Sequence, residues 1–281
     1  MDKPRDYKIF SGFIIKIIAI IAMTFDHIGY FLETLPDVPV FEPLFRVIGR
    51  LSFPLFIFLL VEGIRYTKNT AKYFLRLSLL ALAFFVGQMF YFYFNRESTL
   101  VSPAVDLILT ATCVYLLKRK DKFSFLAILP IAWSFVCLFA RNYELTNNTT
   151  VKWAPFFLRA DYTIYGPLLG IAFYYSNILG RMFLNQKEET KVFVDTTYER
   201  TTVNLISALF LFVVTIIFTL SDKHCLHVIY YLPWELYATL AFIPILLYSG
   251  KRGYNAKWFQ YGCYFYFPMH LIIIFLIFAL L

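Results

Sequence analysis

Residues 16–31 read KIIAIIAMTFDHIGYF, an apolar run with one lysine at its start and the pair Asp26-His27 near its end. Lys16 and His27 are eleven residues apart, almost three helical turns, so both side chains lie on one face, about 16 Å apart along the axis. A titratable group inside a membrane helix is costly and indicates a functional site. The stretch therefore predicts a first membrane helix whose Lys16 and His27 are functional residues.

The composition predicts a membrane protein. Of the 281 residues, 60% are hydrophobic, 21% are aromatic and only 16% are charged. A soluble domain carries roughly a quarter of charged residues. Apolar runs of about twenty residues, long enough to cross a bilayer, recur along the chain. We therefore predict an all-α polytopic membrane protein in which residues 1–281 form a single bundle.

The apolar runs predict about nine membrane helices, within a range of about eight to eleven. The longest polar stretch, about 181–200, is predicted to be a connector that divides the bundle into six helices and three. The predicted helices are 12–33, 46–66, 71–94, 101–118, 123–141, 159–180, 202–221, 230–248 and 258–280.

The lysines and arginines gather at alternate ends of these helices. One side has eighteen: Lys3, Arg5, Lys8, Arg65, Lys68, Lys72, Arg76, Lys118, Arg119, Lys120, Lys122, Arg181, Lys187, Lys191, Arg200, Lys251, Arg252 and Lys257. The other side has six: Arg46, Arg96, Arg141, Lys152, Arg159 and Lys223. By the positive-inside rule the N-terminus is predicted to be cytoplasmic and the C-terminus outside. We interpret the net charge of +8 as topology signal and lipid contact rather than a nucleic-acid footprint.

Eight ionisable residues are predicted to lie at a similar depth, in the middle or the outer part of the membrane. Each charged one would cost about 2.5–3.5 kcal/mol on a lipid-facing helix, so we expect one inward-facing polar cavity that opens to the outer side. The residues are Asp26, His27, Arg46, Arg50, Asp106, Asp161, Glu235 and His270. A structural salt bridge of Asp161, or histidines bonded to backbone carbonyls, is the alternative interpretation.

The cytoplasmic helix ends are predicted to form a basic mouth. Lys16, Glu62 and Arg65 stand there, followed by Lys68, Lys72 and Arg76. This patch either contacts lipid headgroups or seats a phosphorylated ligand such as the nucleotide end of coenzyme A. The four cysteines show no CxxC pattern, so we predict neither disulfides nor a metal site.

Four blocks resemble the TraX family of membrane acetyltransferases, in the order of that family. They are KIIAIIAMTFDHIGYF (16–31), RVIGRLSFPLFIFLLVEGIRYT (46–67), ADYTIYGPLLG (160–170) and FYFPMHLIIIFL (265–276). The family is named for an enzyme that acetylates the N-terminus of a pilin subunit. It is related to the acyltransferase-3 superfamily, whose first helix carries an Arg/Lys-x10-His motif that Lys16 and His27 satisfy.

This resemblance implies a multi-pass protein of the bacterial cell membrane that uses acetyl-CoA as co-substrate. His27 would be the catalytic histidine, and Lys16 would face the acyl-CoA. Glu62, Arg65 and Arg76 are our further candidates for the acyl-CoA site. The acceptor would be an amine or hydroxyl of a surface protein such as pilin, a glycan or a lipid, reached from outside.

The remaining roles are hypotheses drawn from the residues. Arg50 is expected to stabilise an oxyanion, Asp161 or Glu235 to orient His27, and His270 to belong to the catalytic group. Asp26, also a catalytic candidate, lies about 100° round the helix from His27, so it is not assumed to be its partner. Arg46, Asp106 and Glu235 are candidates for the acceptor site.

Two other classes of function remain open. An ion- or proton-coupled transporter also gathers acids, histidines and arginines at mid-membrane, but the sequence shows no pair of broken helices in matching halves. A structural membrane protein would not need the Lys16 to His27 spacing. Transport of a substrate without coenzyme A would distinguish a transporter from an acyltransferase.

Overall fold

The computed structural model describes residues 9–33, 35, 37, 39–94, 101–185 and 196–280. Lys3, Arg5, Lys8, Arg96, Lys187 and Lys191, together with residues 186–195 of the predicted connector, lie outside this part of the chain.

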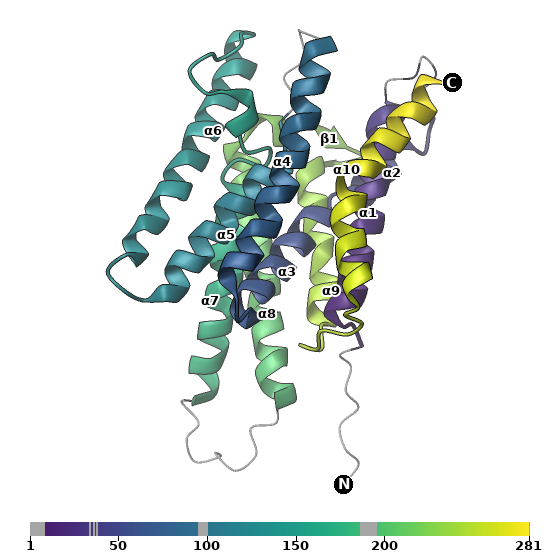
Figure 1. Cartoon of the computed structure of the whole chain (residues 1–281). Coiled ribbons are helices and arrows are strands. Elements are labelled where there is room, and N and C mark those ends of the chain that lie inside the picture. The colour runs from purple at the N-terminus through teal and green to yellow at the C-terminus, as the bar shows by residue number, and fades with distance from the viewer. Residues whose placement is uncertain are drawn as a thin grey trace.

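The described residues are mostly helical (Figure 1). The α-helices are α1 (Gly12–Leu32), α2 (Glu42–Gly49), α3 (Ser52–Tyr66), α4 (Thr70–Phe94), α5 (Pro103–Arg119), α6 (Ile128–Asn147), α7 (Tyr165–Asn185), α8 (Thr196–Ser221), α9 (Phe242–Leu246) and α10 (Lys257–Ala279). The 3-10 helices are η1 (Ser124–Ala127), η2 (Phe156–Leu158), η4 (Lys223–Leu226) and η5 (Trp234–Ala241). Strands β1 (Val228–Ile229) and β2 (Leu232–Pro233) pair antiparallel.

Six helical segments of the described chain are long and apolar enough to cross a membrane. They are Gly12–Leu32, Glu42–Tyr66, Thr70–Met89, Ser124–Asn147, Glu199–Ser221 and Lys257–Phe278. The chain is therefore an all-α polytopic membrane protein. Nine spans and the orientation of the termini remain predictions, because α5, α7 and the pair η5–α9 are shorter or less apolar.

Three predicted helix starts that bear on candidate site residues are wrong. The helix predicted at 46–66 already begins at Glu42, so Arg46 and Arg50 lie one and two turns inside it rather than at its start. Pro43 in the first turn explains this start, because its missing N–H has no intrahelical acceptor there.

In contrast, the helices predicted at 159–180 and 230–248 begin later than predicted, at Tyr165 and Trp234. Asp161 does not open a helix: it lies in a loop before Tyr165, in which Thr163 adopts φ 47°. Residues 228–233 form a hairpin whose turn residue Tyr230 has φ 57°. A positive φ in a residue with a side chain ends helical geometry.

The apolar core is centred on α3. In the most apolar window of Glu42–Tyr66, 67% of residues are buried, compared with 11% in the window of α10. Leu55, Ile57 and Phe58 of α3 are almost fully buried. Helix α10 thus lies at the periphery and presents an apolar surface, as a helix facing lipid does.

Two glycines let α1 and α2 approach closely. A Cβ atom at Gly49 would lie 2.3 Å from Cβ of Asp26, and one at Gly29 would lie 2.8 Å from Cδ of Arg46. Small residues at a helix interface allow this approach in membranes. The contact brings Asp26 against the arginines of the next helix.

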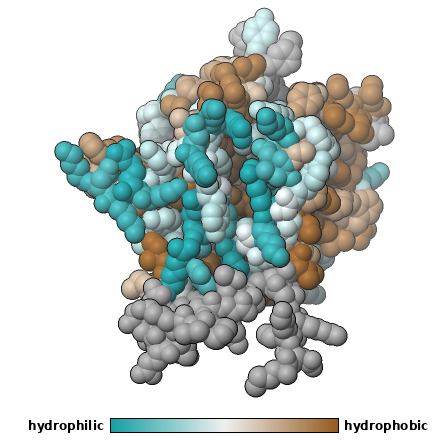
Figure 2. Space-filling model, turned by 60° about the horizontal axis from the view of Figure 1, so that its bottom comes forward, coloured by the Kyte–Doolittle hydropathy of each residue, from teal (hydrophilic) through white to brown (hydrophobic). Residues whose placement is uncertain are grey.

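The bundle has two ends, called lower and upper after Figure 1. Helix α1 begins at the lower end and α10 finishes at the upper end. Helices α3, α5 and α7 end at the lower end, and α4, α8 and α10 begin there. Hydrophilic side chains cover much of this lower face (Figure 2). By charge it corresponds to the side predicted to be cytoplasmic.

Candidate functional site

A buried ion cluster joins α1 to the helix formed by α2 and α3. Asp26 Oδ1 accepts from Arg46 Nη1 at 2.9 Å and from Arg50 Nη2 at 2.5 Å. Arg46 Nη1 also donates to the backbone oxygen of Asp26 at 3.1 Å. Both arginines are at least 93% buried. Asp26 is therefore the counter-ion of two arginines.

Helix η5 completes this cluster from the other side. Arg50 Nη1 lies 3.3 Å from Glu235 Oε2, and Glu235 is 2% exposed. The preceding ring, Trp234, lies 4.9 Å from Cζ of Arg46 and 4.6 Å from Cζ of Arg50. Both distances are in the range of a cation–π interaction. The two guanidinium groups are thus held between two carboxylates and one indole.

Next to the cluster, two histidines 243 residues apart form a hydrogen bond. His27 Nδ1 lies 2.9 Å from His270 Nε2, and His270 Nδ1 lies 3.0 Å from the carbonyl oxygen of Tyr266. A carbonyl only accepts, so Nδ1 of His270 carries a proton and Nε2 of a neutral His270 is the acceptor. His27 Nδ1–H therefore donates, which leaves the lone pair of a neutral His27 on Nε2.

Among the described residues, the hydrogen bond of the His27 ring is the one through Nδ1, so the lone pair on Nε2 has no partner there. Asp26, Arg46 and Arg50 all lie close enough to His27 for their charges to act on it. A neutral imidazole with a free Nε2 is the form that a general base requires.

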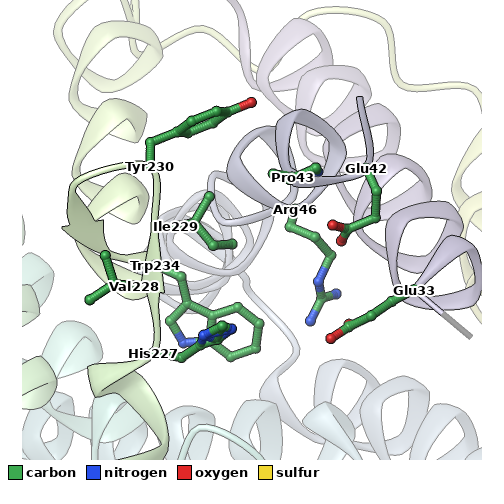
Figure 3. A pocket seen from close by; sticks show the side chains of 9 residues that line it. All are labelled: Glu33, Glu42, Pro43, Arg46, His227, Val228, Ile229, Tyr230 and Trp234. Atoms are coloured by element: carbon green, nitrogen blue, oxygen red, sulfur yellow. The ribbon is translucent and has the colours of Figure 1, made fainter. Parts of the chain in front are cut away.

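A small cavity lies above the ion cluster at the upper end (Figure 3). It has a volume of about 220 Å³, and its lining combines Arg46 with two carboxylates and several aromatic rings. Its lining residues are Glu33, Glu42, Pro43, Arg46, His227, Val228, Ile229, Tyr230 and Trp234. The guanidinium of Arg46 points into this cavity and toward Glu33 (Figure 3). We call it the upper pocket.

Asp106 lies outside the lining of the upper pocket. It is fully buried on α5, and its Oδ2 accepts from the backbone N–H of Asp161 at 2.7 Å and of Tyr162 at 3.2 Å. Asp106 thus fixes the loop before α7. The backbone oxygen of Asp161 in turn accepts from Arg141, so this loop is held on both sides.

A second polar cluster lies at the lower end. Glu62 bridges Arg65 at 2.8 Å and Arg200 at 3.1 Å. Arg65 also donates to Asn177 Oδ1, and Arg200 Nε donates to Asn204 at 2.9 Å. Glu62 therefore orients two arginines of different helices.

Lys16 and Arg76 lie apart from this lower cluster. A Cβ at Gly12 would lie 3.8 Å from Leu59, and α1 and α3 run in opposite directions. Gly12 and Leu59 are therefore at the same height in the bundle. Lys16 is four residues above that height on α1, and Arg65 is six residues below it on α3. At roughly 1.5 Å per residue the two are about 15 Å apart along the helices. Arg76 lies 5.9 Å from the ring centre of Tyr261.

The structure brings some predicted residues together. Asp26, Arg46, Arg50 and Glu235 form one cluster, and His27 pairs with His270. The hydrogen-bond partner of His27 is His270 rather than Asp161 or Glu235.

Sequence reasoning missed Trp234 and Arg200. The position of Trp234 directly before Glu235 in PWEL was the available signal, whereas Arg200 was assigned to the solvated connector.

Comparison with known proteins identifies one family model and one relative that match part of the chain. The family model described as "TraX protein" matches residues 11–176. The chain is 42% identical over 82 residues to a probable fimbrial assembly protein FimC, serogroup H1, of Dichelobacter nodosus. That match covers 29% of this chain and 32% of the relative, so the chain spans about a third of its length. No solved structure matches the chain.

The TraX model covers more than half of the chain, from α1 to α7, and includes His27, both arginines of the ion cluster and Glu62. The chain therefore belongs to the TraX protein family.

Proposed function

We propose that the protein is an integral membrane acyltransferase that moves an acyl group from acyl-CoA to an amine or hydroxyl acceptor. Membership of the TraX family supports this reaction class. The resemblance of Lys16 and His27 to the acyltransferase-3 motif, noted in the sequence, adds to this support. The observation that carries the proposal is the unpaired Nε2 lone pair of His27 beside the buried arginines.

In this mechanism His27 Nε2 takes the proton of the acceptor N–H or O–H as the acceptor attacks the thioester carbonyl. The C–S bond then breaks, and His27 returns the proton to the coenzyme A thiolate. The products are an amide or ester and free coenzyme A. His270 Nε2 accepts the Nδ1–H bond of His27 and thereby stabilises the transient imidazolium.

The two arginines have different roles in this proposal. Arg50 donates to both Asp26 and Glu235, so its charge is already shared between two carboxylates. Among the described residues, Arg46 bonds through Nη1 alone, and its Nε is buried without a hydrogen-bond partner. Arg46 is therefore our candidate to contact the developing oxyanion or an anionic group of the acceptor.

The acyl donor would enter from the lower end. Its nucleotide phosphates would meet Arg65 and Arg200, with Glu62 orienting both guanidinium groups. Because Lys16 is about 15 Å from Arg65 along the helices, Lys16 would contact the pantetheine arm instead. Arg76 keeps its place as a candidate at the rim of this entrance.

The acceptor would enter through the upper pocket, which lies beside the ion cluster. The name of the FimC relative refers to fimbrial assembly, which favours a pilin-like surface protein as acceptor, with a glycan as the other candidate. We place the protein in the bacterial cell membrane, lower end in the cytoplasm, because the basic residues gather there.

The test uses membrane vesicles that contain the protein and [14C]acetyl-CoA. We expect acetyl incorporation into protein or glycan to fall about 100-fold or more in His27→Ala. His224→Ala, the same change at a histidine outside the pair, should keep the activity. Incorporation at the wild-type level by a folded His27→Ala protein would refute the role of His27.

A second measurement tests the donor site and the transporter alternative. Calorimetric binding of acetyl-CoA to the purified protein should be lost in Lys16→Glu and retained in His27→Ala. If the folded wild-type protein does not bind acetyl-CoA, the buried Asp26–Arg50–Glu235 cluster favours a transporter. Tracer uptake into vesicles without coenzyme A would then identify it.

A further inference from the structure

We propose that Tyr266 and Thr24 are positioning residues that hold the histidine pair in its base-competent tautomer. The proposal deepens the proposed function, on which it rests. The two side chains join α10 to α1 at the level just below His27 and His270: the Tyr266 hydroxyl lies 2.7 Å from Thr24 Oγ1.

The direction of this hydrogen bond follows from the partners of Thr24. Its hydroxyl has one proton and donates it to the carbonyl oxygen of Ile20, 2.9 Å away in the same helix. The Tyr266 O–H must therefore be the donor to Thr24 Oγ1. Thr24 thus presents a fixed acceptor on the face of α1 that meets α10.

Tyr266 controls His270 in two further ways. Its ring stacks on the His270 imidazole, with centroids 5.2 Å apart and an angle of 12° between the planes. Its carbonyl oxygen accepts the Nδ1–H of His270 at 3.0 Å. The first contact fixes the plane of the imidazole, and the second fixes which nitrogen faces His27 as an acceptor.

Helix α10 needs such a tether because its other contacts with the bundle are largely apolar, such as those of Phe267 with Phe56 and Phe84. Its apolar window is 11% buried, and Pro268 stands inside the helix, between Tyr266 and His270. Proline has no N–H, so the helix lacks one backbone hydrogen bond within a turn of His270. Among the described side chains of α10, those of Tyr266 and His270 form hydrogen bonds with side chains of α1. Without the Tyr266 hydrogen bond, the His270–His27 hydrogen bond would be the remaining one of the two.

The experiment removes one hydroxyl at a time from the full-length protein. Tyr266→Phe and Thr24→Val each keep the side-chain shape, and each should lower kcat for coenzyme A release about 10- to 100-fold with little change in KM for acetyl-CoA. Thr24→Ser, which keeps the hydroxyl, should restore most of the rate. The double variant should be no slower than the slower single variant, because both changes break one hydrogen bond.

Matched controls separate a local effect from general damage. Tyr264→Phe removes a hydroxyl from the same helix, and Thr219→Val removes a similar intrahelical bond from α8, where Thr219 Oγ1 donates to Thr215 at 2.8 Å. Both should retain the wild-type rate. If either slows the reaction as much as Tyr266→Phe, the tether is refuted.

A spectroscopic readout makes the test independent of acyl transfer. The chain has four histidines, so 15N-histidine NMR in nanodiscs can assign each ring by single substitution. We expect a protonated Nδ1 and an unprotonated Nε2 on His27 in the wild type, and loss of this pattern in Tyr266→Phe. An unchanged spectrum refutes the tether, whereas a changed spectrum without acetyl transfer in the wild type refutes the acyltransferase and leaves the tether standing.

Discussion

Asp26 and His27 are neighbours in sequence but serve different partners. Successive residues of a helix point about 100° apart, so Asp26 faces Arg46 of α2 and Arg50, which directly follows α2, while His27 faces α10. The dipeptide thereby places an ion cluster and a histidine pair side by side. This arrangement depends on how closely α1 and α2 approach, and hence on Gly49.

Gly49→Ala should destabilise the protein by about 1–3 kcal/mol, because the new methyl group would overlap Asp26. The Cβ would lie 2.3 Å from Asp26 Cβ and 2.7 Å from its Cα. Gly262→Ala is the matched control, since a Cβ there meets no atom within 4 Å. The free energy of unfolding in SDS titrations should fall for Gly49→Ala alone; equal stability of the two variants would contradict the close packing.

The sequence predicted which side chains are unusual better than it predicted their partners. Asp26, His27, Arg46 and Arg50 stood out because each is costly in a membrane. Their partners Glu235 and His270 are over 180 residues away, and no local periodicity reports such a contact. The choice of Asp161 or Glu235 as the residue that orients His27 failed for this reason.

At the element scale, the C-terminal end of the buried helix α3 is capped by a side chain from another helix. Its last carbonyl groups lack intrahelical donors, and Lys118 of α5 supplies one: Nζ donates to the oxygens of Ile64 at 2.7 Å and of Arg65 at 3.2 Å. A lysine that reads as a topology signal in the sequence is therefore also a helix cap.

Lys118→Met should lower the free energy of unfolding by about 1–2 kcal/mol, because the carbonyls lose a charged donor while the aliphatic stem is kept. Lys122→Met, in the exposed turn after α5, is the control and should change it by less than about 0.5 kcal/mol. Thermal unfolding in detergent measures both. A loss of stability in both variants alike would point to net charge instead of the cap.

The sequence predicted that the helices exist more accurately than it predicted the residues at which they begin. Apolar runs located α1, α4, α5 and α10 to within about two residues at each end. The errors fall where a proline or a tertiary hydrogen bond decides the start: Pro43 lets a helix begin early, and Asp106 holds the N–H groups of Asp161 and Tyr162 in a loop. A buried acceptor on another helix cannot be read from local sequence.

The whole bundle has an orientation that labelling in cells can test. The basic lower end is predicted to be cytoplasmic. A membrane-impermeant maleimide should label Asn148→Cys, after α6, in intact cells, and Lys120→Cys, after α5, only in permeabilised cells. The opposite pattern would invert the orientation, and labelling of both from one side would contradict the assignment of α6 as a span.

The separation of His27 and His270 has a consequence for biosynthesis. The two residues are 243 positions apart, and a ribosome adds about 5–20 residues per second, so His27 waits roughly 12–50 s before its partner is made. During that interval the imidazole of His27 has no histidine partner. The hydrogen bond between the two rings therefore forms late, and a nascent chain stalled before α10 would carry every residue of the ion cluster yet have no histidine pair.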